Sequence, residues 1–416
     1  MVDGSNLIKD GDKLATYKYQ LTEFYIITDG ETDKIPIERI AKFKIENHFE
    51  NAVFPIFKLE LLLEPSRYYN LLKNRDKVKF KVRVQMYYTT NDNPEEKSML
   101  RDYINDTFVF FTDDDNRDQH DSLKKDEEKD INELDQLNNL VELFLFKDIV
   151  TKLRAPVNYV FSNINLCTAV CYLLNKAGVK KVLMSPFENT KTYGQLICPP
   201  LSTEAMIRYL NNNFGFHKKG SMLFFGFFHN YLLNCKEGCT AWYTKEWKES
   251  KIYILDKSNT KSHIAGSFIR KDEEIFYTLV SPDLIDIQNS SVSANVIGGL
   301  NPKVVDMKAS STDTSKVGAS GIASDNTRIM FNDSSNPYMA ETFAALQKAN
   351  STIISVIVDN INLEAFNPNK KHTITFENTE LNSKYGGTYR IAQAIYSFQN
   401  AAGDFSIRAT ITFKKL

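Results

Sequence analysis

Two histidines and two cysteines lie close enough in the sequence to suggest a metal site. His229, Cys235 and Cys239 fall within one short stretch, and His217 could supply a fourth ligand. Imidazole and thiolate groups are the usual ligands of tetrahedral zinc, but the Cys-x3-Cys spacing is looser than a Cys-x2-Cys knuckle. The two histidines also do not recur at helical spacing. We therefore expect packed or partly exposed thiols and no metal, although the sequence leaves open whether Cys235 and Cys239 bind anything.

Three other kinds of site, a calcium loop, a phosphate-binding loop and a glycine-rich motif, lack residues that their geometry requires. Asp114, Asn116 and Asp118 alternate as in an EF-hand loop, but Gln119 replaces the glycine and Lys125 replaces the bidentate glutamate. No glycine is followed by lysine, which excludes a P-loop. The cluster Gly318-Ala-Ser-Gly321 is neither a dinucleotide fingerprint nor a nucleophile elbow.

No set of residues in this sequence forms a recognisable catalytic group. The six histidines are scattered, so no Ser-His or Cys-His nucleophile can be assembled, and nothing singles out two of the 52 acidic residues as a glycosidase pair. We therefore expect no catalytic residue, no cofactor and no enzyme activity.

An aromatic run has two interpretations. Phe224, Phe225, Phe227, Phe228 and Tyr231 could line a sugar-binding platform. Alternate members of such a run more often fill a core, and we favour that interpretation.

The first third of the chain alternates apolar and polar residues, as half-buried antiparallel strands do. Phe57 to Leu63 and Val78 to Met86 have this period of two. Between them, Pro65 to Leu72 is typical of a short helix capped by Ser66. A strand from Ile104 to Phe111 follows, and Leu137 to Leu153 is predicted as a returning strand.

The segment from Asp113 to Asp135 carries eleven acidic and four basic residues, and we expect a long solvated loop whose deletion leaves assembly intact. The rest of the chain has 47 basic and 41 acidic residues, so the net charge of −1 combines an acidic loop with a mildly basic body. That balance disfavours a protein whose main task is to coat nucleic acid.

The middle of the chain mixes helices and strands. A helix is predicted from Asn163 to Lys176, with Ile164, Cys167, Cys171 and Leu174 on its buried stripe. A second helix is expected to begin at Ser202 or Thr203. Strand-like runs follow, at residues 222–228, 251–255, 263–269 and 274–280.

The last third begins with a segment without aromatic residues, from Thr278 to Met330, which we interpret as a serine-rich linker or loop. A helix is predicted near Pro337 to Ala349. Four strands then close the chain, at residues 352–358, 372–376, 388–398 and 405–413, with Gln399 to Gly403 as a five-residue hairpin loop between the last two.

Five cysteines in 416 residues are typical of a reducing compartment. The N-terminus shows no secretory signal, and no apolar run reaches the length of a membrane span.

Several segments together resemble the central baseplate hub proteins of contractile-tailed bacteriophages, which are related to the hub half of type VI secretion spikes. The resemblance covers nearly the whole chain. It rests on Phe54-Pro-Ile-Phe-Lys-Leu-Glu-Leu61, Tyr193-Gly-Gln-Leu-Ile197 before Pro199-Pro200, Tyr209-Leu-Asn-Asn-Asn-Phe-Gly-Phe216, Phe224-Phe225, Tyr231-Leu-Leu, Pro368-Asn-Lys, Tyr385-Gly-Gly-Thr-Tyr-Arg-Ile391 and the final hairpin. The acidic insertion and the serine-rich stretch have no place in that family pattern.

The resemblance implies an α+β, mainly β protein with two tail-tube-like antiparallel β-barrel domains and an α+β middle region. The expected divisions are 1–155 with the acidic insertion 113–135, 156–288, 289–336 as linker, and 337–416 completed by strands of the middle region. It further implies a homotrimer that forms a pseudo-hexameric ring, joins the tail tube to the central spike, contacts other baseplate proteins and lets DNA pass without specific binding. The protein would assemble in the host cytoplasm and reside in the virion.

Two other functions stay open at this point. A carbohydrate-binding tail adhesin would use the Phe and Tyr runs, and loss of glycan binding on substitution of Phe227 and Tyr231 would favour it. A tail-associated cell-wall hydrolase would require activity that is lost when one carboxylate is changed.

Overall fold

The structure is a computed structural model of the 416-residue chain. It describes residues 13–49, 55–90, 93–112, 139–179, 182–184, 186–217, 221–226, 231–236, 250–255, 266–269, 275–280, 288–289, 293–296, 303–305, 312–313, 327–330, 352–363, 366, 372–401 and 404–415. The acidic insertion and the helix predicted near Pro337 lie outside these residues.

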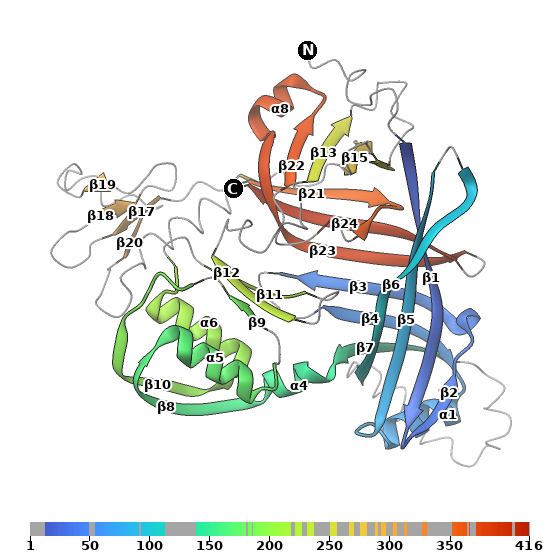
Figure 1. The fold of residues 1–416 in the computed structure, drawn as a ribbon, viewed down its shortest axis with the longest axis horizontal. Coiled ribbons are helices and arrows are strands. Elements are labelled where there is room, and N and C mark those ends of the chain that lie inside the picture. Colours follow the sequence, from blue (N-terminus) through green and yellow to red (C-terminus); the bar gives the residue numbers. More distant parts are fainter. Residues whose placement is uncertain are drawn as a thin grey trace.

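Strands from both ends of the chain form one ring-like sheet (Figure 1). The hydrogen-bonded path runs β1–β5–β6–β7–β4–β3–β23–β24 and returns to β1 where Tyr19 pairs with Phe405. The strands are β1 (Lys13–Thr28), β3 (Ile40–His48), β4 (Ile56–Leu63), β5 (Val78–Thr90), β6 (Asn93–Thr112), β7 (Asn139–Lys147), β23 (Gly387–Ala401) and β24 (Asp404–Lys415), and β2 (Glu31–Lys34) pairs with the end of β1. The first and last parts of the chain therefore close one structure.

A second closed path shares β1, β23 and β24 with the first. It continues from β23 through β22 (His372–Phe376), β13 (Ser250–Leu255), β15 (Ile275–Val280) and β14 (Gly266–Ile269), which pairs with the start of β1. β13 is parallel to both of its neighbours, so the expectation of purely antiparallel pairing is wrong here. More than a hundred residues separate β13 from β22, which is ample for the crossover that parallel pairing needs.

The final hairpin is tighter than the sequence suggested. β23 and β24 pair along their whole length until Ala401 lies opposite Asp404, so two residues connect them where five were expected. Outside β24 lies β21 (Thr352–Asp359), whose first residues also pair with β16 (Gln288–Asn289). The strand predicted from Ile104 to Phe111 is longer in the structure, because β6 begins at Asn93 and ends at Thr112.

One hydrophobic core runs through both closed paths. The alternation expected from the sequence is confirmed in β4, where Phe57, Leu59, Leu61 and Leu63 are buried and the intervening residues are partly exposed. The same core contains Ile252 of β13 and Ile374 of β22. The two closed paths therefore share one hydrophobic core, whose side chains contact one another across both.

Two short helical segments lie beside the first path. They are the 3-10 turn η2 (Ile37–Arg39) and helix α1 (Pro65–Lys73). The predicted Ser66 cap is wrong: the N-cap residue is Glu64, and Ser66 already lies in the first turn. Pro65 explains this start, because the first helical position needs no backbone N–H donor.

The middle of the chain forms a smaller α+β unit with its own core (Figure 1). Its helices are α4 (Asp148–Arg154), α5 (Leu166–Lys176) and α6 (Thr203–Phe214), and its strands are β8 (Pro156–Asn165), β9 (Val182–Met184), β10 (Thr192–Ser202), β11 (Ser221–Gly226) and β12 (Tyr231–Lys236). Figure 1 shows α5 and α6 lying over the β8–β10 pair. Asn165 caps α5 and Ser202 caps α6 through their side-chain oxygens. The predicted start of α6 is thereby confirmed.

The predicted strand from Leu137 to Leu153 is in fact a strand followed by a helix. β7 ends at Lys147, and Asp148 begins α4. An acidic residue in the first turn of a helix is favoured by the helix dipole, which the apolar pattern alone does not reveal.

The described residues of the serine-rich segment form short strands. β17 (Ser293–Val296), β18 (Lys303–Val305), β19 (Thr312–Asp313) and β20 (Thr327–Met330) make a four-stranded sheet. The expectation of an α+β, mainly β protein is confirmed, whereas the division into two barrel domains stays a prediction. None of the described helices is long and apolar enough to cross a membrane.

Candidate assembly surfaces

The proposed metal ligands are not brought together in the described residues. His217 is fully buried beside Phe216, and its ring lies edge-on to Phe187 at 5.4 Å between centroids. Cys235 lies on β12, while His229 and Cys239 fall outside the description, as do the EF-hand-like residues of the acidic insertion. Among the residues that are described, no group of three His, Cys, Asp or Glu side chains could hold an ion.

The aromatic run can be placed only through its backbone. Phe224 and Phe225 lie on β11 and Tyr231 on β12, which pair antiparallel, and Phe227 and Phe228 lie outside the described residues. The interpretation of these residues as core stays a prediction.

The predicted burial of Cys167 and Cys171 is wrong. Cys171 is exposed and Cys167 is only partly covered. Helix α5 buries the adjacent stripe formed by Leu166, Ala169, Val170, Leu173 and Leu174. The sequence places apolar residues all round this helix, so its periodicity does not select which face turns inward.

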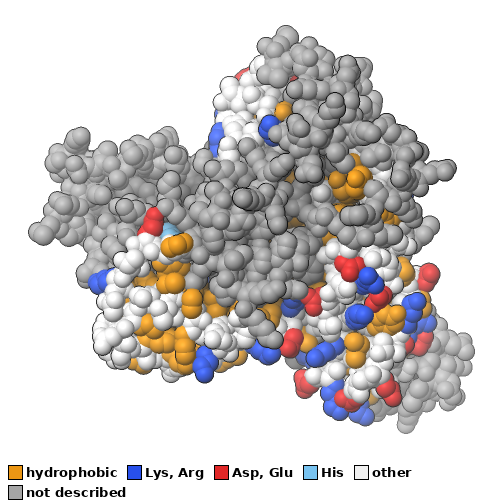
Figure 2. Space-filling model, viewed as in Figure 1, with side chains coloured by type: hydrophobic (Ala, Val, Ile, Leu, Met, Phe, Trp, Pro, Cys, Tyr) orange, Lys and Arg blue, Asp and Glu red, His pale blue; other side chains and the backbone are white. Residues whose placement is uncertain are grey.

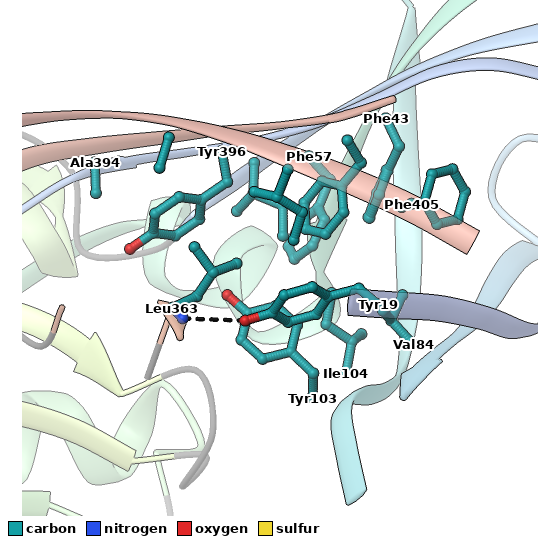
Figure 3. Packing of buried hydrophobic residues seen from close by; sticks show 14 of the residues in the cluster. Tyr19, Phe43, Phe57, Val84, Tyr103, Ile104, Leu363, Ala394, Tyr396 and Phe405 are labelled. Atoms are coloured by element: carbon teal, nitrogen blue, oxygen red, sulfur yellow. Dashed lines mark hydrogen bonds between the residues drawn. The ribbon is translucent and has the colours of Figure 1, made fainter. Parts of the chain in front are cut away.

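The interior of the first path is filled with side chains from all eight of its strands, and Figure 3 shows part of this packing. Tyr19 lies at its centre, where its hydroxyl accepts a hydrogen bond from the Leu363 amide at 3.0 Å and donates one to the Ile361 carbonyl at 3.1 Å. Its ring is edge-on to Tyr103 and Phe398. This interior is a packed core, so no channel for a polymer runs through it.

Strand β7 joins the two cores. Val141, Leu143 and Leu145 point into the main core, whereas Phe146 belongs to the core of the middle unit. Phe144 also packs against the middle unit, which explains why the sequence of β7 is apolar on both faces. The helical unit is therefore held on the outer face of the sheet by aromatic side chains.

The outer face of β1, β5 and β6 carries a cluster of acidic and basic side chains that pair with one another. Glu23 pairs with Lys81 at 2.8 Å and with Arg83 at 3.0 Å, and Arg83 also pairs with Asp102 at 2.9 Å. Hydrogen bonds from Lys81 and then Arg83 hold the pKa of Glu23 below its ordinary value. The bond from Arg83 lowers the pKa of Asp102 in the same way. Lys81 and Arg83 of β5 therefore present paired charges on this face.

A similar network covers β3 and β4. The carboxylate of Glu46 lies 2.7 Å from the Lys44 amine and 3.4 Å from the Lys58 amine. Partial burial alone would raise its pKa, but the two lysines outweigh that effect and the pKa is lowered. The ammonium of Lys58 also lies 5.4 Å from the centre of the Phe144 ring, where the sheet meets the middle unit.

The β8–β10 sheet differs from these charged faces. Val160 and Ile197 are directly paired across it, and they are 59% and 58% exposed. Figure 2 shows hydrophobic side chains gathered over this part of the molecule, at the lower left. The sequence analysis did not predict β8. The signal that could have revealed it is the recurrence of Val157, Tyr159 and Phe161 at every second residue, and these three side chains pack against the core of the middle unit.

Comparison with known proteins places the chain in a family. Residues 10–416 match the family model described as bacteriophage PBS1 gene 109 protein. The chain belongs to this phage protein family. A search of curated proteins gives no match. The resemblance to phage proteins inferred from the sequence is thereby confirmed.

A search of the solved structures also finds chains that align with most of this chain. One is the tail protein from Neisseria meningitidis MC58, with 8% identity, a TM-score of 0.48 and coverage of 95% of this chain and 96% of that chain. Another is the prophage MuSo2 43 kDa tail protein from Shewanella oneidensis, with 12% identity, a TM-score of 0.45 and coverage of 93% and 96%. A third is the lidded Francisella PdpA-VgrG complex, with 11% identity and a TM-score of 0.47. That alignment covers 99% of this chain and 54% of the matched chain, so this chain spans about half the length of the matched one.

Proposed function

We propose that this phage protein is a structural subunit of the tail baseplate, a hub that forms a homotrimeric, pseudo-hexameric ring. In this proposal the ring joins the tail tube on one side to the central spike on the other and contacts other baseplate proteins. The protein acts as a virion component, assembles in the host cytoplasm and has no enzymatic role.

The observation that carries the proposal is the pair of closed strand paths in one chain. They share β1, β23 and β24, and each uses strands that the other lacks. Two ring-like units in each subunit, repeated three times, supply the six units needed to face a six-fold tube. A three-fold subunit arrangement would at the same time match a three-fold spike.

The packed interior limits where DNA could pass. Tyr19, Phe57 and Phe398 are almost fully buried at the centre of the first path, so a channel there is sterically closed. In a trimer the channel would instead lie on the shared axis between subunits. The ion-paired faces of the main sheet suit such passage, because paired charges offer few free cations for phosphate binding.

Light scattering and electron microscopy of the purified chain, alone and with its spike, test this proposal. We expect a particle of three times the 47.7 kDa chain mass and ring-shaped images with a central opening. A monomer at micromolar concentration in both samples, with no ring in the micrographs, would contradict the proposal.

A further inference from the structure

Strand β8 has one side along which no other strand pairs in the described part of the chain. There, β8 pairs only with β10. Neither strand contains a charged residue, although a quarter of the chain is charged. Figure 1 shows the pair at the lower left, away from the main sheet, and described residues, many of them hydrophobic, form the surface there in Figure 2.

The two edges of this pair differ in their protection against further pairing. On β10, Pro199 and Pro200 stand together opposite the single residue Asn158, which shifts the register. Proline has no amide hydrogen to donate, and a bulge bends its strand, so both features hinder pairing with another chain. On β8, residues 157–162 have no proline, no charge and no inserted residue, and Asn163 ends this regular stretch at a φ of 50°. We call residues 157–162 the β8 edge.

Three aromatic rings lie beside the β8 edge. Tyr172 of α5 is 38% exposed, and its ring is edge-on to Tyr159 and Phe161 of β8, at 5.4 and 5.5 Å between centroids. The two β8 rings are partly exposed. Because α5 packs on β8 while α6 packs on β10, the exposed Tyr172 lies on the open side of β8. We call these three rings the aromatic wall.

One cation accompanies the aromatic wall. The ammonium of Lys176 lies 5.6 Å from the centre of the Tyr172 ring. Lys176 is exposed and joins no ion pair among the described residues. An acidic group placed beside this wall would therefore find an opposite charge.

We propose that the β8 edge binds an extended segment of another protein, which adds as a third strand beside β8. Alternate side chains of that segment would contact the aromatic wall, and the others would lie beside Val160. The segment would be uncharged along the strand, with apolar residues at every second position and an acidic residue at the end near Lys176. Backbone hydrogen bonds would supply affinity and the rings selectivity. This inference goes beyond the proposed hub and does not depend on its subunit count.

The dimensions of the β8 edge favour a single strand over a second copy of this chain. Six residues of strand span about 20 Å, and a strand is about 5 Å wide. A stable contact between two folded proteins usually buries about 800 Å² on each partner. The edge is too narrow for such a contact, whereas an extended peptide needs only one free edge.

A short peptide tests backbone pairing in the full-length protein. The probe is the end-blocked, fluorescently labelled peptide Asp-Thr-Val-Thr-Val-Thr-Val-Thr, together with two forms that carry N-methyl groups on alternate sets of residues. Fluorescence anisotropy should detect binding of the plain peptide. One methylated form should bind like it, because its methyl groups face solvent. The other should bind at least about tenfold more weakly, because it lacks the amide hydrogens that pair with β8.

Two substitutions of matched exposure locate the bound peptide. Val160 and Ile197 are directly paired, and they are 59% and 58% exposed, but only Val160 lies on the open strand. Val160→Asp should weaken binding of the plain peptide at least about tenfold, because it places an unpaired charge beside the added strand. Ile197→Asp should leave binding nearly unchanged. Tyr172→Ala should also weaken binding, and thermal unfolding of each variant verifies its fold.

Several results would overturn the inference. They are no binding of the plain peptide up to about 1 mM, equal binding of the two methylated forms, or equal losses in Val160→Asp and Ile197→Asp. Loss of self-assembly in Val160→Asp alone would show that a second copy occupies the β8 edge, which also overturns it. A monomeric wild type that binds the peptide as described would contradict the proposed ring and leave this inference in place.

Discussion

The hydroxyl of Tyr19 and the backbone amide of Leu363 form a hydrogen bond across 344 residues of sequence. Tyr19 belongs to β1, near the start of the chain, and Leu363 follows β21, close to the end. The same hydroxyl donates to the Ile361 carbonyl. Because all these groups are buried, the bond fixes the C-terminal segment inside the ring formed largely by N-terminal strands (Figure 3).

Tyr19→Phe should destabilise the protein by about 1–3 kcal/mol, because it leaves the Leu363 amide and the Ile361 carbonyl buried without this partner. Urea unfolding followed by fluorescence measures the change. Tyr25→Phe is the control, since Tyr25 is a partly exposed residue on the outer side of the same strand. An equal effect of both substitutions would show that the buried hydroxyl has no special role.

Phe146→Ala should loosen the middle unit selectively. Phe146 packs in the core of α5 and α6, and truncation of a buried phenylalanine costs about 3–5 kcal/mol. Hydrogen exchange should accelerate in α5 and α6 more than in β5. Leu145→Ala, on the opposite face of β7, should accelerate exchange in the main sheet first. Indistinguishable exchange patterns would contradict the two-core description.

Acid should weaken the main sheet through Glu23 and Asp102. Both have pKa values lowered in the folded state by hydrogen bonds from cationic side chains. Their contribution is therefore present at neutral pH and is lost as the pH falls below about 5 and through the folded pKa values. In urea unfolding at a series of pH values, Glu23→Gln should reduce this loss. Glu31→Gln changes an exposed carboxylate that joins no ion pair among the described residues, and it should behave like the wild type.

Ser202→Ala should cost about 1 kcal/mol, because the Ser202 hydroxyl accepts the Ala205 amide and so caps α6. Ser66→Ala should cost much less, since Ser66 lies inside the first turn of α1 and makes no cap. Thermal unfolding of the two variants compares them directly. A larger loss for Ser66→Ala would restore the cap that the sequence suggested and contradict the structure.

Local patterns in the sequence were sufficient for many elements of the fold. The period-two alternation of β4, β5 and β24 predicted these strands, and the capping serine predicted the start of α6. These elements obey rules that operate within a few residues, so the sequence alone reveals them.

Features set by distant contacts could not be predicted in this way. The closure of β1 on β24 and the parallel pairing of β13 depend on residues far apart in the chain. Cys171 was misplaced because α5 is apolar on more than one side, and only packing selects the buried one. The candidate surfaces were missed for a related reason: exposed Val160 and Ile197 look like core residues until the sheet is oriented.

The subunit count of the purified particle tests the central claim most directly. Electron microscopy of the full-length protein with its spike should give a three-fold ring with a pseudo-six-fold outline and an axial opening between subunits. A particle that contains a single copy of the chain, or a ring of any other symmetry, would contradict the account.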